Sequence, residues 1–231
     1  MNNWKKIWEN RSLDLVEDEV SLSELISIDG FDTGYGTIKD KHWIDYVNHV
    51  KKEMAIRDGS SIYEVGCGAG AFLYDFFKNG HKVGGIDYSA SLIEICNKVI
   101  KCKDVRVGEA LSIQVEDKYD FIVSNSVFFY FPSLEYAEAV LEKMIEKANS
   151  GIAILEVNDY DFKEDALKLR KKHLTEEEYN KRYEGLEHLF YKRDWFYNIA
   201  QKHNLHCKIE SQIIEDYQNS SYRFNVYMKK S

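Results

Sequence analysis

Residues 61–70 read SIYEVGCGAG, a short apolar run that leads into three glycines at alternate positions, Gly66, Gly68 and Gly70. Glu64 lies two residues before the first glycine, and a helix-like run follows the last one. Glycine lacks a Cβ and tolerates positive φ, so such a turn lets a ligand approach the bare backbone. The start of a helix presents unpaired N–H groups that attract anions. The spacing therefore predicts a site for a polar, nucleotide-like ligand against this turn.

Polar residues also follow the next three strand-like runs. Asp87 ends the second run, where a carboxylate can accept hydrogen bonds from both hydroxyls of a ribose, and Tyr88 after it could lie against a base. Glu109 follows the third run, and Ser124 and Asn125 come at the end of the fourth. Ligands gather at the carboxyl ends of strands in open α/β sheets. These run ends therefore predict one shared binding site.

The elements that must position these residues alternate along the chain. Strand-like and helix-like runs follow one another between residues 61 and 157, which predicts a mainly parallel sheet with helices on both faces. Two late strand-like runs, residues 206–214 and 222–229, have only a polar turn between them and predict an antiparallel hairpin at one edge of the sheet. Residues 29–36 form a glycine-rich loop within a helical N-terminal cap.

The composition bounds the class of protein. The chain has 231 residues, of which 44% are hydrophobic, and this suits one α/β domain with its own core. The net charge is −8 and no basic face stands out, which argues against nucleic acid as a partner. The four cysteines show no CxxC pair or zinc spacing, so no metal is expected. Without a signal-like start or a long apolar run, we expect a cytoplasmic protein that binds no membrane.

Together, four motifs resemble those of class I S-adenosylmethionine-dependent methyltransferases. They are EVGCGAG at 64–70, GGIDYS at 84–89, VGEA at 107–110 and YDFIVSNSVFFYFP at 119–132. The resemblance runs in family order from about residue 60 to about residue 230. It implies an α/β, Rossmann-like fold with an open, mainly parallel seven-stranded sheet, and S-adenosylmethionine as the cofactor.

The resemblance also implies roles by position. The cofactor-binding residues that it implies are Glu64, Gly66, Gly68, Gly70, Asp87, Tyr88, Glu109, Ala110, Ser124 and Asn125. In the family, the glycine turn packs against the methionine and ribose, and the preceding acid orients the turn or the cofactor's amino group. The acid after the second strand binds the ribose, and the acid after the third strand lies near the adenine. The end of the fourth strand opens toward the methyl group.

The segment after the fourth strand indicates the class of methyl acceptor. Family members that methylate nucleic-acid bases or glutamine amides carry an Asn- or Asp-Pro-Pro-Tyr type motif there, whereas this chain has SNSVFFYFP at 124–132. The chain therefore resembles the small-molecule branch, which implies transfer to an oxygen or nitrogen of a small-molecule substrate. The alternatives are an NAD(P)-dependent oxidoreductase and a non-catalytic S-adenosylmethionine-binding protein. An NAD(P)-dependent oxidoreductase typically carries the pattern G-x-G-x-x-G, but here the third glycine position, residue 71, is Ala71.

Catalytic and substrate residues rest on weaker patterns. His188 is the predicted general base, because a histidine can accept a proton near neutral pH, and Glu156 at the end of the fifth strand is the second candidate. A structural role for His188, and core packing of the aromatic residues, stay open. The predicted substrate and lid residues are Phe31, Tyr35, Tyr130 and Tyr191.

We expect a single domain over residues 1–231 with four parts. These are a helical cap or lid (1–55), a cofactor-binding core (56–158), a helical insertion near the substrate (159–192), and a C-terminal helix with the strand hairpin (193–231). A monomer and a homodimer both remain open.

Overall fold

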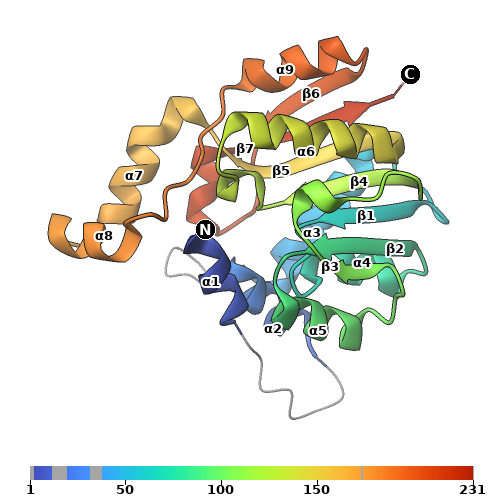
Figure 1. Ribbon diagram of the computed structural model, residues 1–231, viewed down its shortest axis with the longest axis horizontal. Helices are drawn as coiled ribbons and strands as arrows, with labels where there is room; N and C mark the ends of the chain where they lie inside the picture. Colours follow the sequence, from blue (N-terminus) through green and yellow to red (C-terminus); the bar gives the residue numbers. More distant parts are fainter. Residues whose placement is uncertain (1–2, 12–19, 32–37, 173, 231) are drawn as a thin grey trace.

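A seven-stranded sheet forms the centre of the protein (Figure 1). The computed structural model describes residues 3–11, 20–31, 38–172 and 174–230. The strands are β1 (Ser61–Val65), β2 (Lys82–Asp87), β3 (Val105–Val107), β4 (Tyr119–Asn125), β5 (Ala148–Asn158), β6 (His206–Ser211) and β7 (Arg223–Lys229). Their order is β3-β2-β1-β4-β5-β7-β6. The first five are parallel, and β7 is antiparallel to both neighbours, which confirms the predicted mainly parallel sheet.

The two late strands form the predicted antiparallel pair, with a longer connection than the sequence suggested. β7 lies between β5 and β6, so β6 alone forms this edge of the sheet. Residues 212–222 join the two strands and include the 3-10 helix η5 (Gln218–Tyr222). The Tyr217 hydroxyl in this connection accepts a hydrogen bond from Arg223 at 3.1 Å. The connection therefore folds back onto the sheet instead of forming a tight turn.

Nine helices are present in the described part of the chain. They are α1 (Asn3–Glu9), α2 (Leu22–Ile26), α3 (Asp40–Met54), α4 (Ala71–Lys78), α5 (Ala90–Val99), α6 (Leu134–Lys147), α7 (Lys163–Lys171), α8 (Glu176–Tyr183) and α9 (Arg193–Lys202). Shorter turns are η1 (Ser27–Phe31), η2 (Ala110–Ser112), η3 (Phe128–Tyr130) and η4 (Tyr160–Phe162). Ser89 and Ser133 cap α5 and α6 through their side chains. Over the described ranges, no helix is both long and apolar enough to cross a membrane.

Helices cover both faces of the sheet, as predicted. Buried side chains of α3, α4 and α5 form a core on one face, and those of α6 and α9 form a core on the other. Successive side chains of a strand point to opposite faces. Accordingly, Phe121 and Val123 of β4 enter the first core, and Ile122 enters the second. Because both faces are covered, the polar residues of these strands gather at their ends.

The predicted helical insertion, residues 159–192, contains two helices, α7 and α8. Thr175 starts α8 with a capping box, in which its hydroxyl and the Glu178 carboxylate each accept a backbone N–H. No residue of α7 is buried, and α7 and α8 extend from the sheet on the side where α1 lies (Figure 1). Trp4 of α1 donates a hydrogen bond to the Glu187 carbonyl at 3.3 Å. The N-terminal cap and the insertion are therefore in contact.

Candidate functional site

A pocket lies at the carboxyl ends of β1, β2, β3 and β4, where the sequence predicted a shared site. Ten of the predicted residues line it: Phe31, Glu64, Gly66, Gly68, Asp87, Tyr88, Glu109, Ala110, Asn125 and Tyr130. Two tryptophans of the cap, Trp8 and Trp43, also line it, together with Val127 and Tyr136. The structure thus brings together residues from four strand ends and from the N-terminal cap.

The glycine turn is held close to its neighbours. Gly66 and Gly68 have φ of 78° and 51°, which other residues rarely adopt. A Cβ on Gly66 would lie 2.3 Å from Cγ2 of Val127, so only glycine fits there. Gly70 caps α4 and faces Ile100 and Cys96 of the neighbouring helix instead of the pocket. Its surroundings thus indicate a packing role, and its contact with the cofactor stays a prediction.

Asp87 at the end of β2 is fixed by two backbone hydrogen bonds. Its carboxylate accepts from Gly68 N at 3.0 Å and from Ser89 N at 2.8 Å. Burial raises the pKa of Asp87 to about 6, against the effect of these hydrogen bonds. Each carboxylate oxygen retains a further lone pair for a ligand donor. Asp87 is therefore an oriented acceptor joined to the glycine turn.

Glu109 and Tyr88 lie at the outer part of the pocket. The Lys5 ammonium of α1 lies 3.3 Å from the Glu109 carboxylate and 5.9 Å from the centre of the Tyr88 ring. The Glu109 side chain is 53% exposed. An exposed ion pair of this kind contributes little stability. Its significance is positional, because it fixes α1 over the pocket.

Asp29 of the cap reaches the glycine turn, although its sequence position did not predict it as a site residue. Its two carboxylate oxygens accept hydrogen bonds from Ala69 N at 2.7 Å and Ala71 N at 3.0 Å. A Cβ on Gly68 would lie 2.3 Å from Asp29 Oδ1. Burial raises the pKa of Asp29 to about 7 against these hydrogen bonds, and the charge of Asp87 adds to the rise.

Glu64 is a buried acid at the bottom of the pocket. It is 2% exposed, and its Oε2 atom has no hydrogen-bond partner in the described part of the chain. Burial, followed by the charge of Asp29, raises the pKa of Glu64 well above its usual value. An unpaired buried carboxyl oxygen is costly unless a ligand or water completes it. Glu64 therefore marks a position where a polar ligand group would be stabilised.

The end of β4 divides its polar residues between two roles. Ser124 is fully buried and its hydroxyl donates to the Val65 carbonyl at 2.9 Å, so it joins β4 to β1 and does not line the pocket. Asn125 does line it and accepts a hydrogen bond from the Tyr46 hydroxyl at 3.0 Å. Ser126, which was not predicted as a site residue, lines the pocket as well. Ser124 therefore lies outside the pocket, and its contact with the cofactor stays a prediction.

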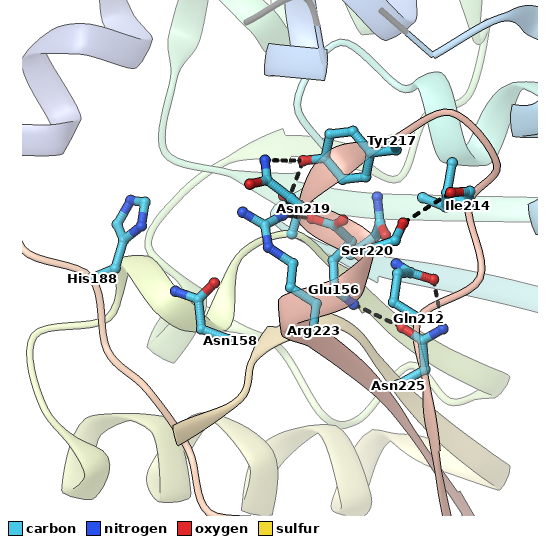
Figure 2. A network of polar contacts seen from close by, with 12 residues as sticks. Glu156, Asn158, His188, Gln212, Ile214, Tyr217, Asn219, Ser220, Arg223 and Asn225 are labelled. Atoms are coloured by element: carbon cyan, nitrogen blue, oxygen red, sulfur yellow. Dashed lines mark hydrogen bonds and ion pairs between the residues drawn. The ribbon is translucent and has the colours of Figure 1, made fainter. Parts of the chain in front are cut away.

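Beside this pocket lies a buried polar network around Glu156 and Arg223 (Figure 2). The two side chains form an ion pair, with Glu156 fully buried and Arg223 8% exposed. Burial lowers the pKa of Arg223 to about 10. Ser126 donates to Glu156 Oε2 at 3.4 Å, and the Glu156 N–H donates to Asn225 Oδ1 at 2.9 Å. Glu156 therefore lies behind Ser126 and does not itself line the pocket.

Both Ser126 and Glu156 adopt the left-handed backbone conformation. Their φ values are 61° and 62°, although neither is glycine. Ser126 N also donates to the Leu155 carbonyl at 3.1 Å, which joins the two strand ends. Such strained residues persist only where the surrounding structure fixes them, and they are concentrated at functional sites.

His188 lies apart from this network (Figure 2). Its ring stacks on Trp4 with centroids 4.7 Å apart and packs against Phe129 and Tyr130. Arg170 donates to His188 Nδ1 at 2.6 Å, since a guanidinium has only donors. Burial, followed by the charge of Arg170, holds the pKa of His188 well below its usual value. His188 lines a second groove beside α7 and α8 and not the main pocket.

The other predicted aromatic residues differ in position. Phe31 packs edge-on against Trp43 with centroids 4.9 Å apart, and both line the pocket. Burial raises the pKa of Tyr130 to about 12, so its hydroxyl is neutral at physiological pH. Tyr191 is fully buried in the core and its hydroxyl donates to the Phe128 carbonyl at 2.7 Å, so it has a packing role. Tyr35 lies outside the described residues.

One further cluster has ligand types suited to a metal ion. His49 and Glu53 of α3 and Glu210 of β6 place their ligand atoms within 4.8 Å of one another. Lys208 pairs with both carboxylates, at 2.8 Å from Glu210. A lysine ammonium already supplies the positive charge here, so the cluster is adequately explained as a surface ion-pair network.

Comparisons with known proteins agree with this arrangement. A family model described as "Methyltransferase domain" matches residues 56–225. Enniatin synthase from Fusarium equiseti is 30% identical over 127 residues, which are 51% of this chain and 4% of that protein. Malonyl-[acyl-carrier protein] O-methyltransferase from Priestia megaterium (strain DSM 319 / IMG 1521) is 31% identical over 94 residues, which are 39% of this chain and 34% of that protein. The chain thus spans only a small part of the first relative and about a third of the second.

The fold is similar to that of a solved structure, the plantazolicin methyltransferase BpumL in complex with triazolic desmethylPZN analog and SAH. The TM-score is 0.64 at 18% sequence identity, and the match covers 100% of each chain. This likeness confirms the predicted Rossmann-like sheet with its antiparallel C-terminal pair.

Proposed function

The chain belongs to the methyltransferase-domain family, and from this premise we propose that it transfers a methyl group from S-adenosylmethionine to an oxygen or nitrogen of a small molecule. The observation that carries the proposal is the convergence of the glycine turn, Asp87 and Glu109 on one pocket. The same pocket reaches Asn125 and Ser126 at the end of β4, where an acceptor would meet the methyl group. Aromatic side chains of the cap close its other side.

The residues present fit this cofactor. Gly66 leaves its backbone bare toward the pocket because a side chain would collide with Val127. Asp87 has lone pairs for two ribose hydroxyls, and Glu64 Oε2 is a buried acceptor that lacks a partner in the described ranges. When bound, S-adenosylmethionine supplies an electrophilic methyl group on a sulfonium. The protein must then hold the acceptor in line and exclude water.

We further propose Ser126 and Glu156 as the route by which a proton leaves an acceptor. Ser126 lines the pocket and its hydroxyl donates to Glu156, so this hydroxyl would take a proton from the acceptor while it gives its own to the carboxylate. Arg223 pairs with Glu156 inside the protein and so provides this buried carboxylate with a counter-charge. The strained backbone at both residues supports a functional role.

His188 stays a prediction as an alternative base. Its ring lies behind Tyr130, outside the main pocket, and its pKa is lowered. A lowered pKa makes a weaker base at neutral pH. We also propose that the insertion and the cap select the acceptor. The hydrogen bond between Trp4 of the cap and Glu187 of the insertion supports this.

Calorimetric titration with S-adenosylmethionine, S-adenosylhomocysteine and NAD tests the cofactor. We expect the first two to bind and NAD not to bind, because Ala71 breaks the dinucleotide pattern. Tight binding of NAD alone would support the oxidoreductase alternative instead. Binding without transfer to any acceptor in small-molecule extracts would support a non-catalytic binding protein.

Three variants separate the proposed catalytic groups. Ser126→Ala and Glu156→Gln should each lower kcat by 10-fold or more, while the Kd for S-adenosylhomocysteine stays within about 3-fold. His188→Asn should leave kcat nearly unchanged if the Ser126 route operates. A large loss of kcat in His188→Asn, with none in Ser126→Ala, would transfer the role of base to His188. Each variant is first compared with the wild type by circular dichroism.

A further inference from the structure

Three carboxylates from three separate elements converge on the main pocket. Asp29 comes from η1, Glu64 from β1 and Asp87 from β2, and all three line it. The three groups are close enough for their charges to interact. The charges of Asp29 and Asp87 each raise the pKa of Glu64, and the charge of Asp87 raises the pKa of Asp29. A fixed concentration of negative charge attracts a cationic group and is stabilised by it.

Among the described residues, two backbone N–H groups orient the Asp29 carboxylate without saturating it. Ala69 N donates to one oxygen at 2.7 Å and Ala71 N to the other at 3.0 Å. A carboxylate has about four acceptor positions, so roughly two remain for a ligand. Arg11 donates to the Ser27 and Ile28 carbonyls at 3.0 and 2.9 Å and so holds η1 in place. The cap therefore presents an acceptor directly at the glycine turn.

The second independent observation is Glu64. Glu64 lines the same pocket, and its Oε2 atom is buried and has no hydrogen-bond partner in the part of the chain that the structure describes. A donor that bridges Asp29 and Glu64 would satisfy this atom and reduce the repulsion between the two carboxylates. An ammonium has three donors and a positive charge, and so meets both requirements.

We propose that Asp29 binds the ammonium group of the cofactor's amino-acid part, together with Glu64. The proposal rests on the proposed function, because it identifies the ligand as an adenosyl amino acid. It makes the cap a part of the cofactor site, since the residue that recognises the ammonium lies outside the strand-and-turn motif. The competing possibility is that Asp29 fills the place of the ligand's own carboxylate and must leave before the ligand binds.

Titrations with two adenosyl compounds test the proposal. S-adenosylhomocysteine carries the amino-acid part, and 5′-methylthioadenosine lacks it. We expect Asp29→Asn to weaken S-adenosylhomocysteine binding by about 10- to 100-fold, since a charge-assisted hydrogen bond is lost, and to change 5′-methylthioadenosine binding less than 3-fold. The matched control is Asp45→Asn, an exposed carboxylate on α3 paired with Lys41, which should change neither.

The outcomes are distinct. Tighter binding of S-adenosylhomocysteine by Asp29→Asn would show that Asp29 competes with the ligand, and an equal loss for both compounds would show a purely structural role. Either result, or no change, would overturn the proposal. If the wild type binds neither compound, the proposed function fails as well, whereas normal wild-type binding with an unaffected variant refutes only the role of Asp29.

A measurement on the wild type needs no variant. Glu64, Asp87 and Arg11 are the charged groups that act on Asp29. Acidification from pH 8 to pH 5.5 should protonate Asp29. We expect this to weaken the binding of S-adenosylhomocysteine by 10-fold or more relative to the binding of 5′-methylthioadenosine. Equal pH profiles for the two compounds would contradict the assignment.

Discussion

The unliganded protein should lose stability as the pH rises from about 4 to about 7, and Asp29→Asn should remove much of this loss. Burial raises the pKa of Asp29 from 3.8 to about 7. A carboxyl with a raised pKa holds its proton more tightly in the folded state than in the unfolded chain. The contribution of Asp29 to the free energy of unfolding is therefore complete below about pH 4 and is lost as the pH rises through about 7. Asp87, with its pKa raised to about 6, acts in the same direction.

The expected size follows from the shift of the Asp29 pKa. A rise from 3.8 to about 7 is about 3 pH units, and each unit corresponds to about 1.4 kcal/mol, which gives an upper limit of about 4 kcal/mol. Asp29 is only partly covered, so we expect about 2 kcal/mol after allowance for solvent screening. The difference in unfolding free energy between pH 5 and pH 8 should therefore be about 2 kcal/mol smaller in Asp29→Asn than in the wild type.

Urea unfolding at pH 5, 6, 7 and 8, without ligand, measures this difference. The slope with pH is informative even if the variant is more or less stable overall, because the asparagine also changes one of the hydrogen bonds to the turn. Asp45→Asn, an exposed carboxylate, should keep the wild-type profile. Parallel profiles for the wild type and Asp29→Asn would refute the inference that the pKa of the half-buried Asp29 is raised at the glycine turn.

Three further predictions concern the site and its supporting network. Asp87→Asn should weaken S-adenosylhomocysteine binding by about 10- to 100-fold in calorimetry, because a neutral amide replaces a fixed carboxylate; an unchanged Kd would remove Asp87 from the site. Gly68→Ala should lower the free energy of unfolding by about 2–4 kcal/mol, since the new Cβ would lie 2.3 Å from Asp29 Oδ1 at a φ of 51°. Part of this loss should be recovered in the double variant with Asp29→Ala, and strict additivity in urea unfolding would contradict the contact. Glu156→Gln should lower stability by about 3–5 kcal/mol because it leaves the buried Arg223 charge without its partner, and Arg223→Met in the same chain should restore most of it. A single-variant cost below about 1 kcal/mol would show that the pair is not buried as described.

The sequence predicted the cofactor side of the pocket well, because that side depends on local patterns. A strand followed by closely spaced glycines and a helix start can adopt few conformations, and parallel strands bring their carboxyl ends to one edge. Gly66, Gly68, Asp87 and Glu109 were placed together for this reason. The exception was Gly70, which has the same spacing but faces Cys96 across a helix contact.

The acceptor side was predicted less well, because it depends on which distant segments meet. His188 and Tyr191 belong to the same short segment, yet one stacks on Trp4 and the other is fully buried in the core. Nothing in their spacing distinguishes these environments. Ser124 was assigned to the pocket and Ser126 was not, yet Ser126 lines the pocket and the Ser124 hydroxyl donates to Val65 inside the sheet. Strand alternation alone would place both residues on the same face, and the left-handed backbone at Ser126 separates them.

By itself, the sequence determined the order of strands and helices along the chain, the glycine turn, and the acids at the ends of the second and third strands, since each of these is set by residues close together in the chain. Only the tertiary structure decided that Asp29, forty residues before Ala69, places its carboxylate on the turn. The same holds for the Glu156–Arg223 pair, which forms because β7 inserts beside β5. Contacts of this kind are selected by the packing of whole elements, and no local pattern records them.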